Sequence, residues 1–268
     1  MTICRLEVSN PAFTPDNTQF VTVHSSHLNR RHDVSIYNVN AQTENVPIIV
    51  LMHGVYGNHW VWMGLGGIHH VYERLRSEHK ISEFVLVMPS DGGLRDGSAY
   101  LPTKGHGNYE QWIMDDVITA VQKTVENVTI NSPLYLSGLS MGGYGALRLG
   151  AKYAEQVSGI SAHSSITDLL ELTEFVDHSL DAYDCRNLHE SNIVYWMNKN
   201  KNKLPPIRFD CGREDILYSG NIRFVEELKS NGIPHIYETF EGEHSWEYWH
   251  THIVQTFEFF SDIQTHRR

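Results

Sequence analysis

Cysteine is scarce in this chain, and the segments that direct a protein to or through a membrane are missing. The three cysteines, Cys4, Cys185 and Cys211, are odd in number and form no C-x-x-C pair. We therefore expect no disulfide framework and a reducing compartment. The N-terminus has neither the basic nor the apolar region of a secretory signal, and no apolar run is long enough to span a bilayer. These absences favour a cytoplasmic location.

Basic residues are fewer than acidic ones. Lys and Arg number 21 against 32 Asp and Glu, which gives a formal net charge of -11. Nucleic acids and anionic membranes are bound by clustered basic side chains, so we expect neither as a partner. His69 and His70 are adjacent on an expected helix, where they would point in different directions, and no Cys, Asp or third His stands at ligand spacing. We therefore predict no metal site.

Short apolar runs alternate with segments of helical periodicity along most of the chain. Runs of this kind are typical of strands buried on both faces of a parallel sheet. They are residues 47–52, 84–88, 134–136, 159–162, 207–211 and 235–240, preceded by residues 20–23 and 34–39 as an antiparallel edge. The helical patterns cover residues 109–125, 141–153, 219–231 and 246–263.

This alternation predicts the α/β class, with a mostly parallel central sheet and helices on both faces. No repeat, low-complexity tract or linker divides the sequence, so we expect residues 1–268 to form a single domain. Residues 164–206 fit no position in the sheet. We interpret them as a short cap-like insertion.

A G-x-S-x-G sequence marks the most informative turn. Gly138-Leu-Ser140-Met-Gly142 follows the apolar run 134–136 and opens a segment compatible with a helix. This is a nucleophile elbow in its strand–turn–helix context, where flanking glycines make room for a strained turn. The turn would direct the N–H of Met141 toward an oxygen that Ser140 attacks. A structural serine in a glycine-rich turn is the alternative.

A serine nucleophile needs a general base and an acid that orients the base. Asp215 comes just after the predicted strand 207–211, and His244 comes after the strand 235–240. Both lie beyond the carboxyl ends of strands, where an open parallel sheet collects its functional loops. The order serine, acid, histidine is the order of the nucleophile-elbow hydrolases. We predict a catalytic triad of Ser140, His244 and Asp215.

Other acids and histidines compete for these roles. Asp210 lies inside the strand and is expected to face a neighbouring element, while Glu214 fits an exposed loop charge. We prefer Asp215 to both because it lies deepest in the loop after the strand. His250 and His252 lie inside the last helix and are weaker candidates for the base.

An oxyanion hole requires a second N–H besides that of Met141. The strand 47–52 runs into His53-Gly54-Val55, the expected place for this donor, and we assign it to the N–H of Val55. His53 is interpreted as a structural histidine, because a base is already available.

Several aromatic side chains are candidates for the walls of a substrate pocket. They are Tyr56, Trp60, Tyr100 and Trp246. Packing in the core or in a loop is the alternative for each of them.

The motifs around the three triad residues resemble those of the esterase D family. They are Gly-Leu-Ser140-Met-Gly-Gly-Tyr-Gly-Ala-Leu, Cys-Gly-x-x-Asp215-x-Leu-Tyr and Gly-x-His244-x-Trp-x-Tyr-Trp, and the resemblance covers about residues 47–260. The branch that is most similar is that of the tributyrin-esterase-like carboxylesterases. The resemblance implies an α/β-hydrolase fold, no metal or organic cofactor, and cleavage of short acyl esters. Relatives often form homo-oligomers, either dimers or tetramers.

We expect a serine carboxylesterase that hydrolyses short-chain acyl esters, acetyl esters among them, with a small-molecule ester as its partner. An S-formylglutathione hydrolase, which is a thioesterase, is the alternative. Gly54-Val-Tyr-Gly57 stands where those enzymes usually have Gly-Leu-Thr-Cys, and this counts against it. Acyl transfer to a sugar or lipid alcohol is a weaker enzyme hypothesis. A catalytically silent binding module of the same fold is a hypothesis of a different functional class. The presence of Ser140, Asp215 and His244 argues against a loss of catalytic activity.

Overall fold

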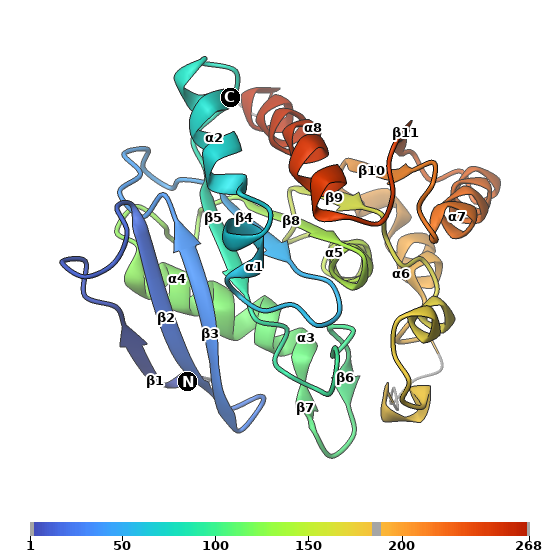
Figure 1. Cartoon of the computed structure of the whole chain (residues 1–268), viewed down its shortest axis with the longest axis horizontal. Helices are drawn as coiled ribbons and strands as arrows, with labels where there is room; N and C mark the ends of the chain where they lie inside the picture. The colour runs from blue at the N-terminus through green and yellow to red at the C-terminus, as the bar shows by residue number, and fades with distance from the viewer. Residues whose placement is uncertain (1–2, 184–188, 267–268) are drawn as a thin grey trace.

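A nine-stranded sheet organises the chain in the computed structural model, which describes residues 3–183 and 189–266 (Figure 1). Its strand order is β1-β2-β3-β5-β4-β8-β9-β10-β11. The strands are β1 (Ile3–Val8), β2 (Thr18–Ser25), β3 (Arg30–Tyr37), β4 (Ile48–Met52), β5 (Val85–Pro89), β8 (Leu134–Leu139), β9 (Gly159–His163), β10 (Ile207–Gly212) and β11 (Ile236–Phe240). A separate two-stranded sheet pairs β6 (Pro102–Thr103) with β7 (Gly107–Asn108).

The pairing directions agree with the predicted fold class. Strands β5, β4, β8, β9, β10 and β11 are mutually parallel, and β3 joins β5 in the antiparallel direction. All the predicted strands are present. The sequence analysis missed β1, whose residues are mostly exposed and therefore carry no clear apolar pattern.

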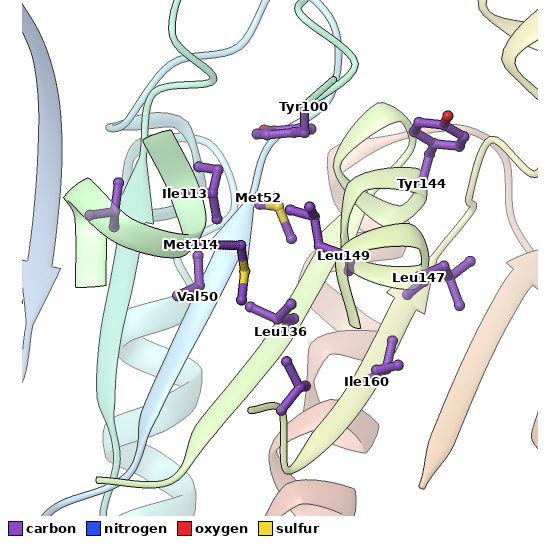
Figure 2. Packing of buried hydrophobic residues seen from close by; sticks show 14 of the residues in the cluster. Val50, Met52, Tyr100, Ile113, Met114, Leu136, Tyr144, Leu147, Leu149 and Ile160 are labelled. Carbon is purple, nitrogen blue, oxygen red and sulfur yellow. The ribbon is translucent and has the colours of Figure 1, made fainter. Parts of the chain in front are cut away.

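Helices cover both faces of the sheet. On one face lie α1 (Val61–Gly64), α2 (Ile68–Ser77) and α8 (Trp246–His266); on the other lie α4 (Ile118–Thr124), α5 (Met141–Lys152), α6 (Ile193–Lys199) and α7 (Tyr218–Ser230) (Figure 1). The strands separate two apolar clusters because successive side chains point to opposite faces. In β4, Val50 and Met52 pack with the α5 side, whereas Ile49 and Leu51 pack with the α8 side. Figure 2 shows the α5 side, where Leu147 and Leu149 lie over the strands.

The predicted helix 109–125 is present as a helical run over residues 109–124, but it is not α-helical throughout. It consists of α3 (Tyr109–Gln111), a π-helical turn (Trp112–Val117) and α4. In this wider turn Asp115 lies 3.0 Å from Nε2 of His27, and Asp116 accepts a hydrogen bond from the hydroxyl of Ser25. The π-helical turn therefore contacts residues of the β2–β3 hairpin that are distant from it in sequence.

The segment between β9 and β10 contributes nothing to the sheet within its described residues, 164–183 and 189–206. It forms α6 and the short 3-10 helices Leu169–Glu174, Leu180–Tyr183 and Lys201–Lys203. Helix α6 packs against α5, which begins at the predicted elbow. The segment thus lies beside the elbow helix, and its interpretation as a cap-like insertion stays a prediction.

A group of buried charges fastens α5 to the elements around it. Arg148 is fully buried, with Nη2 2.8 Å from Oε2 of Glu110 and Nη1 3.0 Å from Oε1 of Glu190. Its Nη2 also donates to the carbonyl of Tyr100 at 2.7 Å. Burial alone would raise the pKa of Glu110, but the charges of Arg148 and Lys152 lower it. One arginine therefore holds α3, the loop before β6 and the 164–206 segment together.

Replacing Arg148 with Met should lower the free energy of unfolding by about 3–5 kcal/mol, because Glu110 and Glu190 lose their fully buried cation and keep only Lys152 as a charged partner. Urea unfolding at neutral pH measures the change. The matched control is Arg223→Met, since the Arg223 side chain is 68% exposed and lies 3.2 Å from Glu171. An exposed pair of this kind contributes less than about 1 kcal/mol. Equal losses in the two variants would contradict a structural role for the buried group.

No helix within the described residues is long and apolar enough to cross a membrane. Cys4 is exposed and Cys211 is buried, and both are free thiols. Cys185 lies outside the described residues.

Candidate active site

Ser140 sits in a strained turn between β8 and α5. Its φ of 53° and ψ of -120° lie in a region that a side chain rarely adopts. A Cβ on Gly142 would lie 2.1 Å from the carbonyl oxygen of Met52, and one on Gly138 would lie 2.3 Å from the carbonyl carbon of Gly142. Only glycine fits at these two positions. The N–H of Ser140 donates to the carbonyl of His163 at 3.0 Å, which fixes the turn against β9.

Asp215 and His244 meet although they follow different strands. Nδ1 of His244 lies 3.0 Å and 2.9 Å from the two carboxylate oxygens of Asp215, which also accepts the N–H of Leu217 at 2.8 Å. The carboxylate therefore holds the proton on Nδ1 and leaves Nε2 as the basic nitrogen. The imidazole is fixed on two sides by aromatic rings, with Phe175 at 5.1 Å and Trp249 at 5.0 Å between centroids.

A cavity of about 280 Å³ brings Ser140 and His244 to a common space. A Cβ on Gly54 would lie 3.2 Å from the Cβ of Ser140, so the loop after β4 passes directly beside the serine. The walls are mostly apolar and are formed by Gly54, Val55, Tyr56, Gly57, Val61, Leu65, Leu139, Phe175, Trp246 and Trp249.

Two backbone N–H groups near Ser140 are candidates for an oxyanion hole. Within the described residues, the N–H groups of Val55 and Met141 have no backbone acceptor, and Val55 lines the cavity. The next N–H, that of Tyr56, donates to the carbonyl of Asp96 at 2.8 Å. This bond fixes the loop and leaves Val55 as the free donor that precedes it.

His53 has the structural role that its position in the sequence favours. It is buried, and its Nε2 accepts the N–H of Asp91 at 2.9 Å, so Nδ1 carries the proton and donates to the carbonyl of Gly54 at 2.6 Å. Burial lowers the pKa of His53, which keeps the ring neutral. The ring therefore ties together the loops after β4 and β5.

Asp210 belongs to a separate buried group. Its carboxylate lies 2.8 Å from Nδ1 of His163, accepts the hydroxyl of Tyr248 at 2.7 Å, and pairs with Arg208. Burial alone would raise the pKa of Asp210, but the interactions with the neighbouring His163 and Arg208 lower it. These partners account for both of its oxygens and place it away from His244.

The other competing residues do not line the cavity either. Glu214 accepts the N–H of Gly242 at 2.6 Å and fixes the loop after β11. Nδ1 of His250 lies 2.7 Å from the carbonyl of Gly66, and the ring of His252 stacks on Phe240 at 4.1 Å.

Two of the four aromatic residues predicted to line the pocket do so. Tyr56 and Trp246 form part of the wall, and the ring of Tyr56 is largely exposed at the mouth. The sequence analysis missed Phe175 and Trp249. Trp249 stands three residues after Trp246 on α8, a helical spacing that could have identified it. Phe175 comes from the 164–206 segment, and no pattern in the sequence linked it to the site.

Tyr100 and Trp60 do not line the cavity, and those predictions were wrong. Tyr100 is fully buried, and its hydroxyl donates to the carbonyl of His53 at 2.9 Å. Trp60 is half-exposed and covers Gly64, where a Cβ would lie 2.6 Å from the indole. Both side chains serve loop packing, which was the alternative weighed for them.

The expectation that His69 and His70 point in different directions was also wrong, because their ring centroids are 3.9 Å apart. They belong to no cluster of three potential ligands among the described residues. The cluster that does occur there joins His27, Asp115 and Asp116, with the potential ligand atoms within 4.8 Å of one another. It lies at the β2–β3 hairpin and contributes nothing to the cavity at Ser140.

Solved structures place this architecture in a known class. A ferulic acid esterase matches with a TM-score of 0.78 and 22% identity, over 97% of this chain and 99% of the other. The S-formylglutathione hydrolase FrmB from Staphylococcus aureus matches with a TM-score of 0.72 and 18% identity, over 95% and 98%. The chain has the α/β-hydrolase fold, as predicted.

Sequence comparison defines the family. The profile of the Esterase family matches residues 25–260, which is most of the chain. An acetyl esterase from Caldicellulosiruptor saccharolyticus is 28% identical over 244 residues, or 85% of this chain and 88% of the relative. The chain belongs to the Esterase family and is a carboxylic ester hydrolase of the serine esterase type.

Proposed function

We propose that this esterase hydrolyses short-chain acyl esters, acetyl esters among them, with Ser140, His244 and Asp215 as its catalytic triad. The observation that carries the proposal is the shared cavity. Ser140 at the strained turn and His244, whose imidazole is held by Asp215, both line it. The N–H groups of Val55 and Met141 have no backbone acceptor among the described residues.

The reaction runs in two halves through an acyl-enzyme. Ser140 Oγ attacks the ester carbonyl while Nε2 of His244 takes its proton, and Asp215 stabilises the resulting imidazolium. The N–H groups of Val55 and Met141 bind the oxyanion of the tetrahedral intermediate. His244 then protonates the departing alcohol, which leaves the acyl group on Ser140. In the second half, His244 takes a proton from a water molecule that attacks the acyl-enzyme, and the acid is released as Ser140 regains its proton.

The cavity favours a small acyl group. Its volume of about 280 Å³ is at the lower end of ligand sites. Phe175, Trp246 and Trp249 form part of its wall with rigid rings, which limit the room for a long chain. The likeness to an acetyl esterase supports the same conclusion.

The test is hydrolysis of p-nitrophenyl esters from acetate to decanoate. We expect kcat/KM to be highest for the shortest chains, because a long chain would have to leave the enclosed part of the cavity. A parallel assay with S-formylglutathione separates an esterase from a thioesterase. Absence of turnover on every ester, together with no labelling of Ser140 by a fluorophosphonate, would overturn the proposal.

A further inference from the structure

A second, polar groove adjoins the cavity at Ser140. It measures about 420 Å³ and shares Tyr56 and Gly57 with the catalytic cavity. Its other lining residues come from β3, from the loop after β4 and from the loop after β5. They are Arg31, His32, Asp33, Asn58, Ser90, Asp91, Gly93, Arg95 and Asp96. The two spaces therefore meet at the ring of Tyr56 but differ in polarity.

An ester bound at Ser140 needs room for both of its ends. If the short acyl group fills the apolar cavity, the alcohol part has to extend beyond it. The polar groove opens next to that cavity across Tyr56, a residue that is 67% exposed. The alcohol part therefore has a polar surface within reach.

Two carboxylates in the groove already accept hydrogen bonds from the protein. The two oxygens of Asp91 accept the N–H groups of Gly93 at 2.8 Å and Ser98 at 2.6 Å. Asp33 accepts the hydroxyl of Thr22. These acids thus shape the groove, and part of their hydrogen-bonding capacity is used within the protein.

The two arginines of the groove differ from these carboxylates in their hydrogen bonding. Arg31 and Arg95 are exposed, and neither guanidinium has a hydrogen-bond or ion-pair partner in the part of the chain that the structure describes. The third acid, Asp96, lies 3.6 Å from Nδ1 of His178. Arg95 also has a left-handed φ of 51°, a conformation that glycine would adopt at lower cost.

We propose that this groove binds a carboxylate on the alcohol part of the ester, through Arg31 and Arg95. The guanidinium group is a planar fork of donors that matches a carboxylate, and these two forks are available for a ligand. The inference rests on the proposed function, because it takes the acyl group to lie in the cavity at Ser140. It names the substrate class as acyl esters of hydroxy acids.

The test compares O-acetyl hydroxy acids, with spacers of increasing length, against the corresponding primary amides. Both compounds of a pair carry the same ester, so the ratio of their kcat/KM values reports recognition of the charge. We expect wild type to prefer the acid at the best spacer. The double variant Arg31→Gln/Arg95→Gln should lower that preference about 10-fold or more, as for a lost hydrogen bond to a charged group.

The matched control is Arg74→Gln, an exposed arginine on α2 outside the groove. It should keep the wild-type ratio. An acid-to-amide ratio that is near one in wild type, or that the double variant leaves unchanged, would overturn the inference while ester hydrolysis still supports the proposed function.

A binding measurement separates the two proposals. Calorimetric titration with the free hydroxy acid needs no turnover, and the Arg31→Gln/Arg95→Gln variant should weaken its binding by a similar factor. Arginine-dependent binding without any ester hydrolysis would retain the groove and refute the proposed function. Binding of equal strength in wild type and variant would refute carboxylate binding by the two arginines of the groove.

Discussion

Replacing Ser140 with Ala is expected to lower kcat for p-nitrophenyl acetate by about 10⁶-fold, the loss that removal of a serine nucleophile causes. The substitution removes the attacking oxygen and with it the acyl-enzyme. Folding should be preserved, because the Ser140 hydroxyl has no hydrogen-bond partner among the described residues. Steady-state kinetics, fluorophosphonate labelling and thermal unfolding together measure these expectations.

Ser137→Ala is the matched control for this experiment. Ser137 is also fully buried on β8, and its hydroxyl likewise has no partner within the described residues, but it does not line the cavity. It should keep both turnover and labelling. Retained turnover in Ser140→Ala would show that another group performs the reaction.

Replacing Asp215 with Asn is expected to lower kcat by about 10⁴-fold with little change in structure. The carboxylate accepts the Nδ1 proton of His244, with oxygens at 3.0 Å and 2.9 Å. An amide can instead donate to Nδ1, which favours the tautomer with the proton on Nε2 and so removes the general base. Comparison of kcat with that of wild type on the same ester measures the effect.

Glu214→Gln tests the same assignment from the other side. Glu214 is the neighbouring acid, yet it accepts the N–H of Gly242 and stays outside the cavity. We expect its kcat to remain within a few-fold of wild type. A loss as large as that of Asp215→Asn would mean that the orienting acid had been misassigned.

Most of the sheet could be predicted from sequence because its strands are short, apolar and buried on both faces. Ile48–Met52 and Val85–Pro89 are examples, with every residue buried. The edge strand Ile3–Val8 has one buried residue and gives no such signal. The π-helical turn at Trp112–Val117 was equally unreadable, since a single extra residue per turn hardly alters helical periodicity.

The candidate site likewise contains residues that the sequence predicted and residues that it did not. Ser140, Asp215 and His244 each follow a strand in an order and context that the sequence shows, and the fold brings Asp215 and His244 into contact. Trp60 and Tyr100 stand on loops near the site, but their rings turn to loop packing. Phe175 was missed because its contact with His244 joins residues far apart in the chain.

The sequence by itself determined the fold class, the elbow at Ser140 and the family, because each depends on local residue order: apolar runs, glycine spacing and motifs. Only the tertiary structure decided which rings line the cavity and that the exposed side chains of Arg31 and Arg95 share a groove beside it. The physical reason is that loop side chains are placed by contacts between distant segments, and these contacts leave no periodic pattern along the chain.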